Sequence, residues 1–158
     1  MLNNEINITS GTLSILNQIM NQNPERHLAL FQSASHSNHI LIDTSQLRTI
    51  FNSPIQYLIN KYKGSQHWGI FTSFIHLTLN HYQIKVLLSY INKTFERPLV
   101  QNMINIYCLT NKIDPSKKIL LTNWKDFKSY VIWKNNSFIK FFTKSNNNYY
   151  QTNFYHIR

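Results

Sequence analysis

The chain has 158 residues, of which 42% are hydrophobic, and a formal net charge of +10. This length and apolar content suffice for one domain with a sizeable core. A single cysteine, Cys108, excludes a disulfide framework and a multi-cysteine metal site. No apolar run approaches the roughly 20 residues of a membrane span, and the polar start, residues 1–10, does not resemble a signal peptide. These features predict a protein of the reducing cytoplasm.

The positive charge comes from 16 Lys and Arg against 6 acidic residues. Such an excess indicates an anionic partner, which can be a nucleic acid, an acidic protein or a membrane surface. The basic residues are scattered and form no dense run. A composition rich in Asn, Lys, Ile and Tyr is therefore the alternative explanation for the charge.

The first third of the chain carries short helical and extended patterns. Leu13, Leu16 and Met20 recur at helical spacing and predict a helix over 12–20, with Ser10 or Thr12 as its cap and Pro24 beyond its end. Four shorter assignments follow in chain order: 28–31 as a helix tail or a strand, 33–38 as a loop, 40–42 as a short strand or helix start, and 44–51 as a helical turn or two.

Residues 68–79 are the clearest strand, because apolar side chains occupy both of its faces. Phe71, Ile75, Leu77 and Leu79 share one face, while Trp68, Ile70, Phe74 and His76 share the other. A strand with two apolar faces is covered from both sides and therefore lies in the centre of a sheet. Residues 55–60 read as its hairpin partner across a loop at 61–66. Asn80 then caps an amphipathic helix over 81–95.

The remaining elements complete a mixed pattern. Residues 104–109 predict a strand, and Asp114-Pro115 predicts the start of a helix whose buried stripe is Leu120, Trp124 and Phe127. Two strands, 130–133 and 138–142, would follow across a tight turn. The prediction is one α+β domain over 1–158, with a mostly antiparallel sheet flanked by helices in an acetyltransferase-like order. Residues 1–10 and 145–158 are treated as terminal tails that could be flexible.

Few residues offer chemistry. His36 and His39 share a polar loop, where they could hold a metal ion, remain solvent-exposed, or supply His36 as a catalytic base near neutral pH. His76 fits a hydrogen-bonded core position better, and Cys108 fits a buried, inert thiol better than a nucleophile. With 3 glycines in all, the chain holds no phosphate-cradling loop.

Several stretches resemble, in order, the toxin-activating lysine acyltransferases that serve RTX haemolysins. The stretches are Ser33-Ala34-Ser35-His36, Ser53-Pro54-Ile55-Gln56-Tyr57 and the strand from Gly69 to Thr78, followed by an amphipathic helix. A further strand, Met103-Ile104-Asn105-Ile106, carries Asn105 where that family has Asp. The resemblance spans roughly residues 28 to 143 in order of elements.

The resemblance implies a cytoplasmic acyltransferase that activates a toxin-like protein by lysine acylation. It would move a fatty acyl group from an acidic acyl carrier protein to a lysine of a protein substrate, without a bound cofactor or metal. His36 would act as the base, and Asn105 would hold its imidazole by a hydrogen bond across a cleft. The chain could act as a homodimer.

Two alternatives remain open. One is a nucleic-acid-binding module, with basic residues around the 114–127 helix and aromatic residues in the tail. Its contact residues would be Lys112, Lys117, Lys118, Lys125, Lys128, Lys140, Lys144, Tyr149, Tyr150, Phe154, Tyr155 and Arg158. The other is a non-catalytic subunit of a larger assembly.

Overall fold

The computed structural model describes residues 3–145 and 149–158, and within them the chain forms eight strands and four helices. The strands are β1 Glu5–Gly11, β2 Leu28–Ser33, β3 His39–Asp43, β4 Ile55–Gly64, β5 Phe71–Thr78, β6 Met103–Asn111, β7 Lys117–Trp124 and β8 Tyr149–Ile157. The helices are α1 Leu13–Gln22, α2 His81–Glu96, α3 Phe127–Asn136 and α4 Ile139–Ser145.

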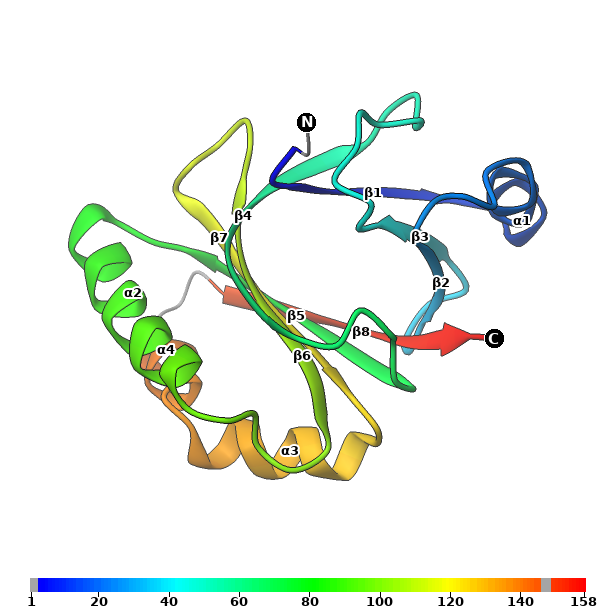
Figure 1. The fold of residues 1–158 in the computed structure, drawn as a ribbon. Coiled ribbons are helices and arrows are strands. Elements are labelled where there is room, and N and C mark those ends of the chain that lie inside the picture. The colour runs from blue at the N-terminus through cyan, green and yellow to red at the C-terminus, as the bar shows by residue number, and fades with distance from the viewer. Residues whose placement is uncertain (1–2, 146–148) are drawn as a thin grey trace.

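The strands close into an antiparallel barrel in the order β1-β3-β2-β8-β5-β7-β6-β4 (Figure 1). This order contains one arrangement twice, since β4-β1-β3-β2 and β8-β5-β7-β6 are equivalent runs. In each run the chain passes through strand, helix, strand, strand and strand. The second half adds α3 and α4 before its last strand, where the first half has residues 44–54 without a helix. The chain is therefore one α+β domain built from two similar halves.

The predicted central strand is confirmed, and both of its faces are buried. Phe71, Ile75 and Leu77 pack on one side with residues of α2 and α3, while Phe74 packs on the other side with strand residues that fill the barrel. Alternate side chains of a strand point to opposite faces, so a barrel strand covered by helices is apolar throughout. Figure 1 shows α2, α3 and α4 on the outer side of the second half.

Helix α2 begins where the sequence predicts. The Asn80 side chain accepts a hydrogen bond from the Gln83 amide at 2.8 Å, and the Gln83 side chain accepts one from the Asn80 amide at 3.0 Å. This reciprocal pair satisfies two amides that the first helical turn leaves free. Leu87 and Ile91 are the buried residues of the helix, and they anchor it on the barrel.

The predicted hairpin of 55–60 with 68–79 is wrong. Strand β4 pairs with β1 and β6, whereas β5 pairs with β7 and β8. The turn signal at Gly64 is real, because its φ of 120° suits glycine. The turn leads from one half of the barrel to the other instead of folding a strand back on itself.

Three predicted elements after residue 110 have the opposite type. Asp114 starts a turn, in which its carboxylate accepts bonds from the Ser116 amide and hydroxyl, and the expected helix is strand β7. The expected strands 130–133 and 138–142 lie in helices α3 and α4. Short apolar runs do not distinguish a buried strand from a buried helix, and tertiary packing decides here. The acetyltransferase-like order is corrected accordingly to a closed barrel.

Residues expected as tails also belong to the barrel. Strand β1 pairs with β3 and β4, and β8 pairs with β2 and β5. Residues 1–2 and 146–148 of the predicted tails lie outside the described residues. Among the described residues, no helix has the length and apolar character needed to cross a membrane.

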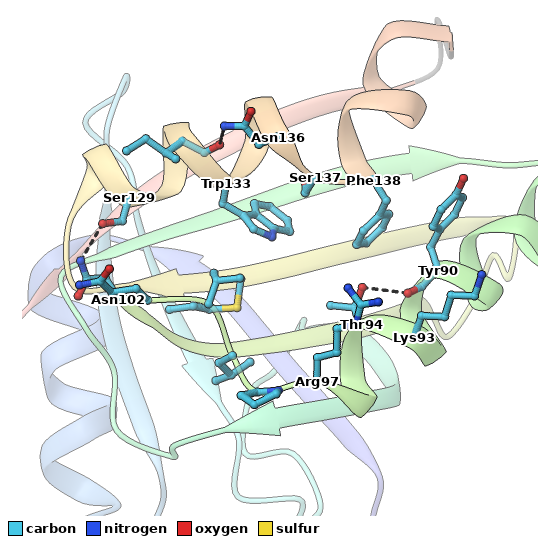
Figure 2. A pocket seen from close by; sticks show the side chains of 16 residues that line it. Tyr90, Lys93, Thr94, Arg97, Asn102, Ser129, Trp133, Asn136, Ser137 and Phe138 are labelled. Atoms are coloured by element: carbon cyan, nitrogen blue, oxygen red, sulfur yellow. Dashed lines mark hydrogen bonds between the residues drawn. The ribbon is translucent and has the colours of Figure 1, made fainter.

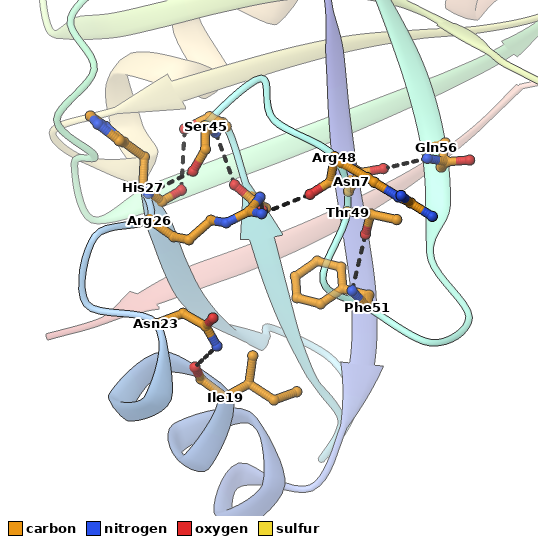
Figure 3. A network of polar contacts seen from close by, with 12 residues as sticks. Asn7, Ile19, Asn23, Arg26, His27, Ser45, Arg48, Thr49, Phe51 and Gln56 are labelled. Atoms are coloured by element: carbon orange, nitrogen blue, oxygen red, sulfur yellow. Dashed lines mark hydrogen bonds and ion pairs between the residues drawn. The ribbon is translucent and has the colours of Figure 1, made fainter. Parts of the chain in front are cut away.

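In the first half, residues 44–54 occupy the place that α3 and α4 have in the second half, and a polar network holds this segment (Figure 3). The predicted helix over 44–51 is not formed. Asp43 is 1% exposed, and its Oδ2 lies 3.0 Å from Nη1 of Arg26. The other guanidinium nitrogen, Nη2, donates to the Arg48 carbonyl at 2.7 Å. The Ser45 amide donates to Oδ1 of Asp43 at 2.9 Å. One buried carboxylate thus fixes both the ion pair and the start of the segment.

Replacement of Asp43 by Asn should lower the free energy of unfolding by about 3–5 kcal/mol, because it leaves Arg26 without its counter-charge. Urea denaturation measures this loss. The double variant Arg26→Met/Asp43→Leu should recover much of it, since apolar residues can replace a buried ion pair. A double variant as unstable as Asp43→Asn would contradict this account.

The Phe71→Ala variant should lose about 3–5 kcal/mol of unfolding free energy, as a large-to-small change in a packed core does. Phe71 is 0% exposed, and its ring contacts the rings of Phe127, Tyr130 and Tyr155. The neighbouring Ile70→Ala, at an exposed position, serves as the control in the same denaturation series. A loss below about 1 kcal/mol for Phe71→Ala would show that this ring is not part of the packed core.

Candidate ligand-binding cleft

A cleft of about 680 Å³ opens on the outside of the barrel, between α2 and α3 (Figure 2). The end of α2, the loop that follows it, α3 and the turn between α3 and α4 form its walls. The lining residues are Tyr90, Lys93, Thr94, Arg97, Pro98, Leu99, Val100, Gln101, Asn102, Met103, Ser129, Ile132, Trp133, Asn136, Ser137 and Phe138. This volume is within the range of pockets that hold cofactors and other small molecules.

Two contacts between the walls delimit the cleft. At one end, Nδ2 of Asn102 donates to the Ser129 hydroxyl at 2.9 Å. At the other, the rings of Tyr90 and Phe138 stack at 5.5 Å between centroids, with planes 7° apart. Trp133 is labelled between these ends in Figure 2 and meets Phe138 edge to face at 6.4 Å. The walls are therefore held apart by defined contacts, and flat rings form part of the surface.

Local sequence explains the shape of the loop between α2 and β6. Arg97 caps α2 in an extended conformation, and Pro98 prevents the helix from continuing. Asn102 has a φ of 70°, a left-handed conformation that Asn tolerates better than most residues. With Asn102 in this conformation, the Met103 amide donates a hydrogen bond to the Val100 carbonyl at 3.1 Å, and the Asn102 side chain donates its hydrogen bond to Ser129.

Helix α3 presents its residues to the cleft at helical spacing. The Asp126 carboxylate accepts the Ser129 amide at 2.8 Å and so starts the helix. Ser129, Ile132, Trp133 and Asn136 then follow at intervals of three, four and seven residues from Ser129 and face the same space. Trp133 also packs against Trp124 of β7, with 5.6 Å between ring centroids, which ties the cleft wall to the core.

The electrostatics of the cleft are positive. Lys93 and Arg97 line it from α2, and the described lining contains no carboxylate. Residues 71–158 hold twelve Lys and Arg against three acidic residues, a net charge of +9, whereas residues 1–70 hold four against three. Nearly all of the excess charge therefore belongs to the half that carries the cleft.

The barrel interior, in contrast, is filled. Phe31, Phe74, Tyr107 and Phe154 lie in its apolar cluster. Asn123 is completely buried, and its side chain bonds to both backbone groups of Gly69, at 2.6 Å to the amide nitrogen and 3.3 Å to the carbonyl oxygen. The Asn123 side chain therefore holds β7 and the 65–70 loop together.

The two predicted catalytic residues are not brought together. His36 lies in the exposed loop between β2 and β3, where its amide donates to the Ser33 hydroxyl at 3.1 Å. Asn105 is fully buried on β6, where its Nδ2 donates to the Ser65 carbonyl at 3.2 Å. Strands β2 and β6 are four positions apart in either direction around the barrel.

The prediction of a buried thiol at Cys108 is confirmed, whereas His39, predicted in a loop, is half-buried at the start of a strand. Cys108 is buried on β6, and burial raises the pKa of its thiol to about 11, so that the reactive thiolate is disfavoured. His39 begins β3, and the described residues contain no group of three or more His, Cys, Asp or Glu that could hold a metal ion.

No protein-family model matches the sequence, and no curated protein does either. Solved structures with this fold do exist. A protein from Listeria monocytogenes, described as an uncharacterized ferredoxin fold protein related to antibiotic biosynthesis monooxygenases, superposes with a TM-score of 0.81 at 17% identity, over 100% of this chain and 96% of its own. The heme-degrading enzyme LmHde of the same species gives 0.78 at 17% identity, over 97% and 99%.

A third structure, titled a major regulator of staphylococcal pathogenesis, gives a TM-score of 0.80 at 17% identity, over 98% of this chain and 99% of its own. Identities this low establish a shared fold and leave activity open. The fold is the barrel-like ferredoxin type of the monooxygenase-like proteins.

These neighbours overturn the resemblance to toxin-activating acyltransferases. The similarity of these structures spans nearly the whole chain, whereas the sequence resemblance rested on short stretches placed in order. Protein-lysine acylation, toxin activation and the roles given there to His36 and Asn105 lose their basis. The nucleic-acid and accessory-subunit alternatives gain no support from these neighbours either.

The sequence did not predict the cleft, because residues 130–133 and 138–142, which lie in or beside its walls, were assigned to strands. The signal that could have found it is the spacing of Ser129, Ile132, Trp133 and Asn136, which suits one face of a helix. Asp126, three residues before Ser129, is a helix cap of the kind recognised correctly at Asn80.

The pH dependence of stability should report on His76, a half-buried residue of β5. Its ring stacks on Tyr150 at 4.1 Å, and burial lowers its pKa to about 4. In the unfolded chain the pKa of a His is about 6.5, so the unfolded state binds the proton more readily than the folded state does. The stability that His76 contributes above about pH 6.5 is therefore lost as the pH falls toward about 4. His76→Phe should retain more of its unfolding free energy between pH 7 and pH 4.5 than the wild type.

Urea denaturation at the two pH values measures this difference. His36→Asn, in the exposed β2–β3 loop, is the matched control. An identical pH dependence in His76→Phe and the wild type would show that His76 does not carry the effect.

Proposed function

We propose that this protein binds a large, flat and mostly apolar small molecule in the cleft between α2 and α3. The observation that carries the proposal is the cleft itself, about 680 Å³ in volume, with apolar and aromatic walls and a few polar groups. Pockets of this size and composition are the usual binding sites for cofactors and other small ligands.

The walls favour a flat ligand that bears an acidic group. The half-buried Phe138 and the edge of the largely buried Trp133 line the cleft, and aromatic rings pack well against another ring system. Lys93 and Arg97 stand on the α2 side of the cleft, and Arg can bind a carboxylate through two parallel hydrogen bonds. A ligand with an aromatic body and a carboxylate edge would satisfy both kinds of lining.

The structural neighbours support a tetrapyrrole as the first ligand to test, since one of them is a heme-degrading enzyme. The cleft fits the body of such a molecule but not an iron centre held by imidazole or thiolate. Among the described residues, its lining contains neither His nor Cys. Of other side chains that can ligate iron, it offers Tyr90, which is stacked on Phe138, and Met103, which is buried.

Binding or carriage is therefore a better proposal than degradation. General acid–base catalysis requires a titratable side chain of suitable pKa within hydrogen-bond reach of the reacting atom. The described lining has no His, Cys, Asp or Glu, and its titratable side chains, Tyr90 and Lys93, are a ring stacked on Phe138 and an exposed side chain of α2. These side chains can orient and enclose a ligand.

Titration with iron-free protoporphyrin IX and with haem tests the proposal, with tryptophan fluorescence as the signal. Trp133 lines the cleft and lies 5.6 Å from Trp124 between ring centroids, so a bound ring should quench both. The two porphyrins should bind with dissociation constants within about threefold of each other, because the iron gains no strong protein ligand.

The variant Asn136→Trp should weaken binding by about tenfold or more, because it places a bulky ring at an exposed position of the lining without touching the core. Tyr82→Trp, an exposed change on α2 away from the cleft, is the matched control. Failure of both porphyrins to bind, or unchanged affinity in Asn136→Trp, would contradict the proposal. Preference for haem by orders of magnitude would show that iron is ligated after all.

A further inference from the structure

The rim of the cleft exposes apolar side chains to solvent. Tyr90, Val100 and Ile132 all line the cleft and are 39%, 46% and 55% exposed. They come from three separate elements, α2, the loop after it and α3, yet they border one opening. Exposed apolar side chains grouped at a single edge commonly mark an interaction surface.

Cations stand among these apolar residues. Lys93 and Arg97 line the same opening and are exposed. Lys128 precedes Ile132 by four residues on α3, so both lie on one face of that helix. None of the three forms an ion pair with a carboxylate of the described residues. We call these six residues, Tyr90, Lys93, Arg97, Val100, Lys128 and Ile132, the rim.

Few negative groups oppose the rim. Glu96 is on α2 beside Arg97 and is exposed, while Asp126 is occupied as the cap of α3. The remaining acidic residue of this half, Asp114, bonds to Ser116 between β6 and β7. The rim therefore presents apolar and positive side chains together, within a half of net charge +9.

We propose that the rim docks this protein on the surface of an anionic lipid bilayer. Lys and Arg side chains near such a surface are attracted by the negative headgroups, and apolar side chains beside them enter the boundary with the acyl chains. The electrostatic attraction and the burial of apolar side chains are each weak, and together they give reversible attachment without a membrane-spanning segment.

The aliphatic residues favour a bilayer over a nucleic acid. Single strands are bound by cations together with rings on which bases stack. Val100 and Ile132 can neither stack on a base nor bond to a phosphate, but they gain free energy by leaving water. Docking does not depend on what the cleft holds. If the proposed apolar ligand is correct, the cleft mouth would face the lipid, and the ligand would enter without crossing water.

Co-sedimentation with vesicles tests the docking. Vesicles of phosphatidylcholine with phosphatidylglycerol should bind the full chain, vesicles of phosphatidylcholine alone should bind it much more weakly, and 0.5 M salt should release it. The triple variant Lys93→Gln/Arg97→Gln/Lys128→Gln should lose roughly 100-fold in partition onto the anionic vesicles. The double variant Val100→Asn/Ile132→Asn should lose about tenfold.

Matched variants separate the rim from overall charge and apolarity. Arg48→Gln/Lys61→Gln/Lys117→Gln removes the same charge from exposed positions outside the rim, and Leu13→Asn/Ile15→Asn removes exposed apolar residues from α1. Both should bind vesicles nearly as the wild type does. Equal losses in rim and control variants would overturn the proposal. The proposal would also be overturned if the protein did not bind vesicles but was retained on a DNA column, and if the Val100→Asn/Ile132→Asn variant was retained on that column equally well.

Discussion

The structure depends on the closure of its barrel, which is completed by two strand pairings between the halves. Strand β8 joins the second half to the first through β2, and β4 joins the first to the second through β6. An open sheet would expose the backbone groups of two edge strands, whereas a closed barrel leaves no edge. Closure also requires the first and last strands of the described chain, so the fold brings together residues from both ends of the sequence.

Closure determines where a ligand can bind. An eight-stranded barrel can fill its interior with side chains or hold one small ligand there, and here aromatic and aliphatic residues occupy the interior. Space remains on the outside, where helices rest on the strands. The first half covers its strands with α1 and the segment fixed by Arg26 and Asp43, while the second half carries α2, α3 and α4. The cleft lies in the second half, between α2, the loop that follows it and α3.

Charge follows the same division between the halves. Residues 71–158 carry almost the entire excess of Lys and Arg, and that half holds both the cleft and its rim. The overall charge indicated an anionic partner but not its nature or position. The structure adds that cations and exposed apolar residues share one edge, which is the combination expected of a surface that meets amphipathic molecules.

The sequence by itself determined the features that arise within a few residues. Asn80 is predicted as the cap of one helix and Ser10 or Thr12 as that of another, and the structure shows one-turn hydrogen bonds at Asn80 and Thr12. The two apolar faces of 68–79 predict a strand covered on both sides, which the structure has at Phe71–Thr78. Only the tertiary structure decided the rest. The pairing of β4 with β6 instead of β5, the strand at 117–124 and the helices at 127–136 and 139–145 depend on partners far away in the chain. Apolar runs of that length are stable as either element, and the packing partner selects between them.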